Sequence, residues 1–243
     1  MEEIFSSIQG EGILVGLRQI FLRFCACNLD CAYCDTPRNR NPKYCMIEDR
    51  PGKRDTRQVE NPVSLGRILG VIDRWITDNP GLHHSISLTG GEPLLYPEIL
   101  AAWLPSLRSR LPVYLETNGV LVDALAGLVK DLDYISMDIK LPSTSGLEDM
   151  WEQHLRFLQV AVQSSLYVKS VISEATEPWE IIKAAELIAS VDRTIPFVLQ
   201  PVTLKNGSIG ITPLKTLKLQ ESAGAILAEV RVIPQTHIFL GQL

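Results

Sequence analysis

Three cysteines at close spacing are the residues of this sequence best suited to chemistry. Cys27, Cys31 and Cys34 follow the spacing C-x3-C-x2-C, directly after the apolar run at 20–24. Iron-sulfur clusters are usually held by four cysteine thiolates. A triplet without a fourth partner indicates a cubane cluster with one open iron, much as a catalytic zinc ion keeps an open position. A structural zinc knuckle is the alternative, and the nearby candidates for its fourth ligand are Cys25 and Cys45.

Length and composition favour a metal-dependent enzyme of the cytoplasm. The 243 residues suffice for one domain, 1–243, with one insertion. A net charge of −5 favours a small charged metabolite over nucleic acid or a membrane surface as the partner. All five cysteines lie between positions 25 and 45, which is typical of a metal site in a reducing compartment. The acidic N-terminus is unlike a signal peptide, and no apolar run approaches the roughly 18 residues of a membrane span.

Apolar periodicity predicts strands that alternate with helices. Strands are expected at 20–24, 85–88, 113–116, 134–139, 166–172, 197–202 and 229–233, and helices at 65–76, 97–110, 120–130, 149–162, 177–190 and 213–227. This order indicates an α/β fold with a parallel sheet. A complete eight-stranded barrel needs about 250 residues, so an incomplete TIM-like barrel of about six parallel strands fits better. Residues 4–19 are expected to be a glycine-punctuated loop, and the charged stretch at about 38–61 a surface insertion.

Polar residues stand where four of the predicted strands end. These ends are Thr89-Gly90-Gly91-Glu92-Pro93, Glu116-Thr117-Asn118-Gly119, Ser136-Met137-Asp138-Ile139-Lys140 and Gln200-Pro201-Val202. Chemistry in α/β barrels lies at the carboxyl ends of the strands, so these residues are expected at one barrel mouth. The last strand leads into Arg231-Val232-Ile233-Pro234-Gln235-Thr236-His237, and this end of the chain could fold over that mouth.

The cysteine triplet, with Tyr33 before its last member, resembles the signature of the radical S-adenosylmethionine (SAM) superfamily. The resemblance implies a 4Fe-4S cluster whose open iron binds SAM, and a 5'-deoxyadenosyl radical as the reactive species. The segment Gly90-Gly91-Glu92-Pro93 is similar to the turn that receives the amino group of SAM in this superfamily.

Further motifs resemble one family, the 7-carboxy-7-deazaguanine synthases. They are Ser-Ile-Gln-Gly-Glu-Gly at 7–12, Phe-Leu-Arg at 21–23, Cys-Asp-Thr at 34–36, Leu-Glu-Thr-Asn-Gly at 115–119, Ser-Met-Asp-Ile-Lys at 136–140 and Arg-Val-Ile-Pro-Gln-Thr-His at 231–237. The resemblance implies conversion of 6-carboxy-5,6,7,8-tetrahydropterin to 7-carboxy-7-deazaguanine with loss of ammonia, a step toward queuosine and other 7-deazapurines. It also implies a magnesium ion, an electron donor such as flavodoxin or ferredoxin, and a homodimer.

The same resemblance implies a role for each matching residue. Cys27, Cys31 and Cys34 would hold the cluster, and Thr36 the magnesium ion. Substrate contacts would come from Ile8, Gln9, Gly10, Glu11, Arg23, Thr89, His237 and the terminal carboxylate of Leu243. SAM contacts would come from Tyr33, Gly91, Glu116, Asn118, Ser136, Met137, Asp138 and Gln200. Without the resemblance, Arg23 would be interpreted as a solvated charge at the edge of the sheet. With the resemblance, its guanidinium is expected to bind the substrate carboxylate.

Two features depart from the family pattern. Ala-Gly commonly precedes the first cluster cysteine, whereas this chain has Cys25-Ala26, and alanine disfavours a positive φ that glycine allows. The insertion at 38–61 is absent from the shortest members. Two alternatives remain at this point: a glycyl-radical enzyme activase, which should lack the motifs at both chain ends, and a zinc-binding module.

The cluster assignment makes a direct prediction for Cys31→Ala. Losing one of three thiolates should abolish SAM cleavage and leave the anaerobically purified protein without its brown colour and its iron. Iron and sulfide analysis, together with an assay for 5'-deoxyadenosine, measures both effects. Wild-type turnover by this variant would contradict the cluster assignment, and zinc in the wild-type protein would favour the zinc module.

Overall fold

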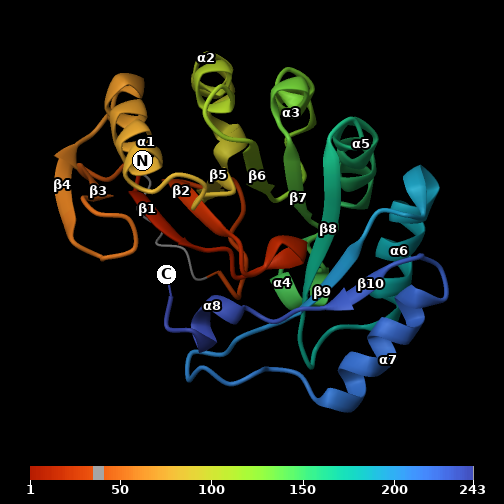
Figure 1. The fold of residues 1–243 in the computed structure, drawn as a ribbon. Coiled ribbons are helices and arrows are strands. Elements are labelled where there is room, and N and C mark those ends of the chain that lie inside the picture. The colour runs from red at the N-terminus through yellow and green to blue at the C-terminus, as the bar shows by residue number, and fades with distance from the viewer. Residues whose placement is uncertain (35–40, 243) are drawn as a thin grey trace.

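The chain folds into one mixed sheet of ten strands, seven of which run parallel. This computed structural model describes residues 1–34 and 41–242. The parallel strands are β2 (Arg18–Phe24), β5 (Ser85–Gly90), β6 (Val113–Thr117), β7 (Tyr134–Asp138), β8 (Ser165–Ile172), β9 (Phe197–Pro201) and β10 (Val230–Val232). The sheet order is β10-β9-β8-β7-β6-β5-β2-β1-β3-β4, and the sheet is curved but open (Figure 1). The expected α/β fold is present, with seven parallel strands where about six were expected.

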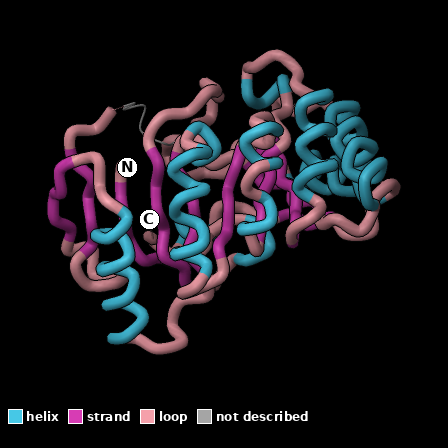
Figure 2. Tube along the Cα trace, turned by 90° about the horizontal axis from the view of Figure 1, so that it is seen from above, coloured by secondary structure: helices cyan, strands magenta, loops and turns pink. Residues whose placement is uncertain are grey.

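Helices cover the outer face of the curved sheet, as Figures 1 and 2 show. They are α1 (Leu65–Asp78), α2 (Pro97–Arg108), α3 (Val122–Ala126), α5 (Trp151–Ala161), α6 (Pro178–Asp192) and α7 (Pro213–Gly224). α2, α3, α5, α6 and α7 each lie between two successive parallel strands, as crossover geometry requires, and α1 connects β4 (Thr56–Glu60) to β5. The long helix expected at 120–130 is shorter: α3 is followed by the 3-10 turn η3 (Val129–Asp131).

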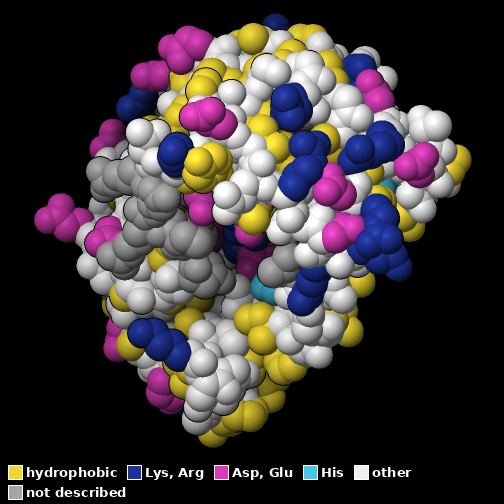
Figure 3. Space-filling view, turned by 90° about the vertical axis from the view of Figure 1, so that its left-hand side faces the viewer, with side chains coloured by type: hydrophobic (Ala, Val, Ile, Leu, Met, Phe, Trp, Pro, Cys, Tyr) yellow, Lys and Arg dark blue, Asp and Glu magenta, His cyan; other side chains and the backbone are white. Residues whose placement is uncertain are grey.

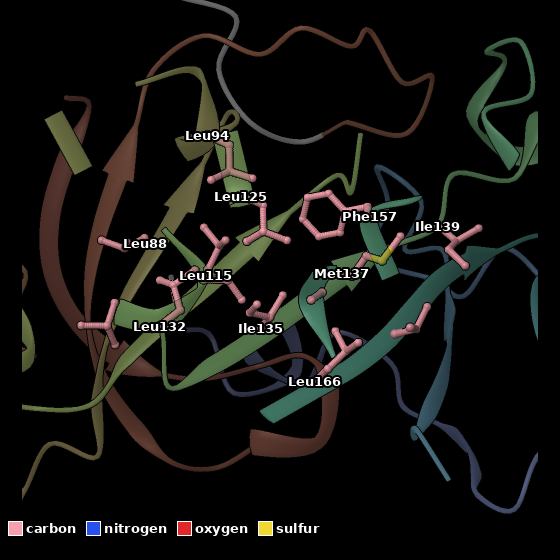
Figure 4. Close-up of a cluster of buried hydrophobic side chains, with 14 of the residues drawn as sticks. Leu88, Leu94, Leu115, Leu125, Leu132, Ile135, Met137, Ile139, Phe157 and Leu166 are labelled. Atoms are coloured by element: carbon pink, nitrogen blue, oxygen red, sulfur yellow. The ribbon is translucent and has the colours of Figure 1, made fainter. Parts of the chain in front are cut away.

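The main core lies between this face of the sheet and the helices. Alternation along the strands supplies it: in β7, Ile135 and Met137 point into the core, while Ser136 and Asp138 point to the inner face. Figure 4 shows Met137 packed among Leu115, Ile135 and Phe157. A smaller cluster of Tyr114, Tyr167 and Val198 lies apart from this core, together with Ile13 and Leu14, and the two tyrosine hydroxyls are 2.5 Å apart.

Three strands at the N-terminal edge of the sheet were not expected. Residues 4–19 were interpreted as a loop, yet β1 (Glu3–Ile8) pairs antiparallel with β2 and is followed by the 3-10 turn η1 (Gly12–Leu14). Within the stretch interpreted as a surface insertion, β3 (Tyr44–Glu48) pairs parallel with β1 and antiparallel with β4 (Thr56–Glu60). Cys45 and Ile47 of β3 are fully buried, and the Trp75 indole of α1 donates to the Asp49 carbonyl at 3.3 Å. The hairpin formed by β3 and β4 is therefore an integral part of the sheet.

Two short helices lie on the inner face of the sheet, and neither of them was predicted from the sequence. They are α4 (Pro142–Ser145), after β7, and α8 (Thr236–Phe239), after β10. At four residues each, they are too short for apolar periodicity to reveal. Among the described residues, no helix combines the length and apolar character needed to cross a bilayer.

Burial of Ile47 predicts that the hairpin contributes to stability. Ile47→Ala should lower the free energy of unfolding by about 2–5 kcal/mol, the usual cost of emptying a buried isoleucine site. Ile99→Ala, at an exposed position of α2, is the matched control and should change stability by no more than about 0.5 kcal/mol. Urea denaturation of both variants measures the difference. Equal, small effects would mean that the hairpin is not packed as described.

Candidate active site

A large cavity opens where the carboxyl ends of the parallel strands meet. Its volume is about 1170 Å³. On the face shown in Figure 3 the surface is hollowed, with acidic and basic side chains inside the hollow. The sequence-predicted residues that line the cavity are Ile8, Gln9, Gly10, Glu11, Arg23, Cys27, Cys31, Tyr33, Cys34, Thr89, Gly91, Glu116, Asn118, Ser136, Asp138, Gln200 and His237. Met137 is not among them, because its side chain lies in the core, and Thr36 and Leu243 lie outside the described residues.

The three cysteines lie on the loop that follows β2. The Cys34 amide donates to the Cys31 carbonyl at 3.1 Å, and the Leu29 amide approaches the Cys27 sulfur at 3.4 Å. Burial raises the pKa of the Cys27 and Cys31 thiols, so a bound metal must displace their protons. Among the described residues, no three His, Cys, Asp or Glu side chains are arranged to hold a single metal ion. The fit to a 4Fe-4S cluster rests on the donors, three thiols that line one cavity.

The turn after β5 packs directly against the cysteine loop. The Gly91 amide donates to the Phe24 carbonyl at 3.0 Å, and the Glu92 amide to the Ala26 carbonyl at 2.8 Å. A Cβ atom on Gly91 would lie 1.7 Å from the Ala26 carbonyl oxygen, so only glycine fits there. Ala26 itself has φ +65°, the left-handed conformation that alanine disfavours. The sequence anticipated this strain from the Cys25-Ala26 departure.

Glu92 organises the floor of the site without lining it. Its buried carboxylate accepts from the Leu94 amide at 3.0 Å, the Asn118 amide at 2.8 Å and the Thr117 hydroxyl at 3.0 Å. Burial raises the pKa of Glu92 to about 7, although these hydrogen bonds oppose the increase. The carboxyl group therefore joins the ends of β5 and β6 and fixes the turn that carries Asn118.

Four buried side-chain oxygens of the cavity lining have no hydrogen-bond partner within the described ranges. Three of them, Asn118 Oδ1, Asp138 Oδ1 and Gln200 Oε1, lie at the ends of β6, β7 and β9, and the fourth is Thr203 Oγ1. Buried acceptors are rarely left unpaired in native proteins. A ligand with amino and hydroxyl donors would satisfy the three acceptors at the strand ends, and SAM carries both kinds of group. The acceptors of the lining therefore suit SAM.

Asp138, Lys140 and Tyr33 form a connected group beside the cysteines. Lys140 Nζ donates to Asp138 Oδ2 at 2.7 Å and to the Tyr33 hydroxyl at 3.2 Å, and lies 5.3 Å from the Tyr33 ring centroid. His154 supports this group from the core side. Its Nε2 accepts from the Lys140 amide at 3.2 Å, so its Nδ1 carries the proton donated to the Gly119 carbonyl. Burial lowers the pKa of His154 to about 4, so the imidazole is neutral.

Residues 8–11 and the end of the chain meet across the cavity. The side-chain amide nitrogen of Gln9 donates to the side chains of Gln19 and Glu116. The side-chain oxygen of Gln9 accepts from the backbone amide of Glu11 at 2.9 Å. The Thr236 amide donates to the Gly10 carbonyl at 2.9 Å, and a Cβ atom on Gly10 would lie 2.0 Å from His237 Nδ1. The C-terminal segment thus packs over the loop after β1, as its position after the last strand suggested.

Arg23 and Thr89 occupy facing positions on β2 and β5. Arg23 Nε pairs with Glu3 at 3.1 Å, and the guanidinium lies 5.3 Å from the Phe5 ring centroid. Thr89 donates to Glu116, which also accepts from Gln9 at 2.8 Å. A guanidinium on the cavity wall is suited to bind a carboxylate.

Sequence reasoning missed Lys169 of β8. Its ammonium pairs with Glu11, and Gln235 donates to the same carboxylate at 2.9 Å. Burial alone would raise the pKa of Glu11, but these contacts hold it at about 2, so Glu11 stays ionised. The available signal was a lysine within the apolar strand Leu166–Ile172, where an uncompensated charge would be costly.

The other two cysteines do not line the cavity. Cys25 packs against Tyr96, whose hydroxyl donates to the Cys25 carbonyl at 2.9 Å, and burial raises the pKa of Cys45 to about 12. Neither is placed to act as the fourth ligand of a zinc knuckle formed with Cys27, Cys31 and Cys34.

Comparison with known proteins identifies the class of protein that this fold and site define. The model of the radical SAM superfamily matches residues 22–173, so the chain belongs to that superfamily. A radical SAM methyltransferase from Sphaerobacter thermophilus superposes with a TM-score of 0.63 and 11% identity, over 92% of this chain and 68% of that one. TYW1 with a lysine-pyruvate adduct bound superposes with a TM-score of 0.54 and 16% identity, over 87% of this chain and 74% of that one. At such identities these likenesses show the fold alone.

Relatives in sequence narrow the class to one family. The 7-carboxy-7-deazaguanine synthase of Geobacter sulfurreducens is 55% identical over 243 residues, which are 100% of this chain and 97% of the relative. The one from Methanothermobacter thermautotrophicus is 34% identical over 98% of this chain and 96% of the relative. This chain belongs to the family of 7-carboxy-7-deazaguanine synthases. The alternatives of a glycyl-radical activase and a zinc module are thereby set aside.

The strain at Ala26 makes a testable prediction. Ala26→Gly should raise the free energy of unfolding by about 1 kcal/mol, because the left-handed conformation costs alanine about 1–2 kcal/mol and glycine little. Ala102→Gly, at an exposed position inside α2, should lower it by about 0.5–1 kcal/mol. Anaerobic urea denaturation of the two variants measures these opposite signs. A destabilised Ala26→Gly variant would contradict the assigned backbone conformation.

Proposed function

We propose that this chain is a radical SAM enzyme that converts 6-carboxy-5,6,7,8-tetrahydropterin to 7-carboxy-7-deazaguanine and ammonia, a step toward queuosine and related 7-deazapurines. The observation that supports this proposal most directly is that the three cysteines line the same cavity as Glu11, Arg23 and His237. Family membership supports the same reaction, because the relatives carry the name of that product. The reaction has no net redox change, in keeping with SAM acting as a regenerated cofactor.

When bound, the cluster and SAM would supply a 5'-deoxyadenosyl radical able to remove the hydrogen at C6 of the pterin. Cys27, Cys31 and Cys34 would hold the cluster at one wall of the cavity. The unpaired oxygens of Asn118, Asp138 and Gln200 would accept hydrogen bonds from SAM. Tyr33, Gly91, Glu116 and Ser136 line the same region, and Met137 would contribute only its backbone, because its side chain is in the core.

Other residues of the cavity lining would orient the pterin. Arg23 would bind its carboxylate, with Thr89 beside it. Glu11, held ionised by Lys169, would accept from the pterin amino and ring N–H groups. Ile8, Gln9 and Gly10 form the wall that carries Glu11, and His237 covers it from the C-terminal segment. These contacts would hold the substrate by its carboxylate and by its amino and ring N–H groups.

Further parts of the proposal rest on the resemblance of motifs. Thr36 would bind a magnesium ion, since a hard hydroxyl oxygen suits this cation together with substrate oxygens and water, and the Leu243 carboxylate would join the substrate site. A flavodoxin or ferredoxin would reduce the cluster, and the enzyme would act as a homodimer in the cytoplasm, where cysteines stay reduced.

An anaerobic assay of the iron-reconstituted protein with dithionite, SAM, magnesium and 6-carboxytetrahydropterin tests the reaction. Mass spectrometry should detect 7-carboxy-7-deazaguanine. SAM cleavage to 5'-deoxyadenosine with the pterin unchanged would leave the radical SAM assignment intact and overturn the proposed substrate.

Arg23→Ala should separate substrate binding from SAM cleavage. Loss of the guanidinium removes the charge partner of the substrate carboxylate, so KM for the pterin should rise by about tenfold or more. Slow formation of 5'-deoxyadenosine should persist, because Arg23 is not one of the three cysteines proposed to hold the cluster. Steady-state kinetics and 5'-deoxyadenosine analysis measure both effects. An unchanged KM would contradict the role assigned to Arg23.

A further inference from the structure

Lys169 lies between two carboxylates that belong to different parts of the cavity. Its ammonium pairs with Glu11 Oε2 and lies 3.8 Å from Asp138 Oδ2. Lys169 and Asp138 are direct partners in the pairing of β7 with β8, so both side chains point to the inner face of the sheet. The Lys169 side chain is only 13% exposed, and its charge is therefore weakly screened by water.

The two carboxylates contact the two proposed ligands separately. Glu11 belongs to the wall proposed to bind the pterin, and its other oxygen accepts from Gln235 at 2.9 Å. Asp138 belongs to the wall proposed to bind SAM, where Oδ1 has no partner within the described chain and Oδ2 pairs with Lys140 at 2.7 Å. Lys169 is the cation that the two walls share.

A shared cation connects the two binding events. When pterin N–H groups donate to Glu11, they compete with Lys169 for the negative charge of Glu11. The Lys169 ammonium is then attracted more strongly to Asp138 than to Glu11. A stronger contact with Asp138 Oδ2 fixes that carboxylate with Oδ1 directed into the cavity. SAM then meets an acceptor that is already oriented, at a lower entropic cost.

We propose that Lys169 is a positioning residue that couples the two ligands, so that pterin bound at Glu11 tightens the binding of SAM at Asp138. This inference rests on the proposed function, because it takes the pterin and SAM as the occupants of the two walls. By linkage, SAM tightens pterin binding by the same factor. The coupling favours cluster-bound SAM when the substrate is present to receive the radical.

The test measures SAM affinity on the cluster-loaded enzyme with the cluster oxidised, so that binding occurs without turnover. Anaerobic equilibrium dialysis gives the Kd of SAM with and without saturating 6-carboxytetrahydropterin. In the wild type, the substrate should lower this Kd by about fivefold or more, within the usual range of coupling between sites. In Lys169→Met, which keeps the length of the side chain and removes its charge, the ratio of the two Kd values should fall to within about twofold of one.

Two matched variants separate coupling from general damage. Lys130→Met makes the same change at an exposed position and should keep the wild-type ratio. Lys169→Arg keeps the positive charge and should retain most of the coupling. Under turnover conditions, Lys169→Met should also release more 5'-deoxyadenosine per molecule of product than the wild type.

Each result decides the inference. A wild-type ratio in Lys169→Met, or no coupling in the wild type, overturns it. If Lys169→Met loses iron or melts far below the wild type, Lys169→Arg and Glu11→Gln decide instead. Lys169→Arg should then retain the coupling, and Glu11→Gln should lose it. Coupling retained in both variants overturns the inference. Wild-type enzyme that makes no 7-carboxy-7-deazaguanine overturns the proposed function, whereas product formation with an unchanged ratio in the variants overturns only the coupling.

Discussion

The contact between the cysteine loop and the turn after β5 is the constraint on which the site depends. Two backbone hydrogen bonds join these segments, and the Ala26 carbonyl occupies the space where a side chain at position 91 would lie. Glu92 extends the same contact to β6 through the Asn118 amide. The loop that carries the three cysteines and the strand ends proposed to bind SAM are thus held as one unit, and Ala26 adopts a strained conformation to make this approach.

Three cations of the cavity lining are each paired with a carboxylate. Arg23 pairs with Glu3, Lys140 with Asp138, and Lys169 with Glu11. Pairing is required because an unpaired buried charge would lower the free energy of unfolding by several kcal/mol. The consequence for function is that each wall of the cavity is already organised before a ligand arrives. Preorganised groups of this kind lower the cost of ordering at the moment of binding.

The C-terminal segment completes the site from outside the parallel sheet. Gln235 and Thr236 bond to the loop after β1, and α8 begins at that contact. The two ends of the chain therefore build one wall together. This explains why the motifs at 7–12 and 231–237 occur together, although more than two hundred residues separate them.

The sequence by itself determined the parallel strands, the cysteine loop and the polar strand ends, because each depends on local periodicity or short spacing. It also indicated the strain at Ala26 from one substitution in a loop. Only the tertiary structure showed β1, β3 and β4, since strands such as Thr56–Glu60 carry charged residues and depend on partners distant in the chain. It alone brought Lys169 to Glu11, 158 residues away, and directed Met137 into the core rather than the cavity. These outcomes depend on strand register and side-chain direction, which residue spacing does not specify.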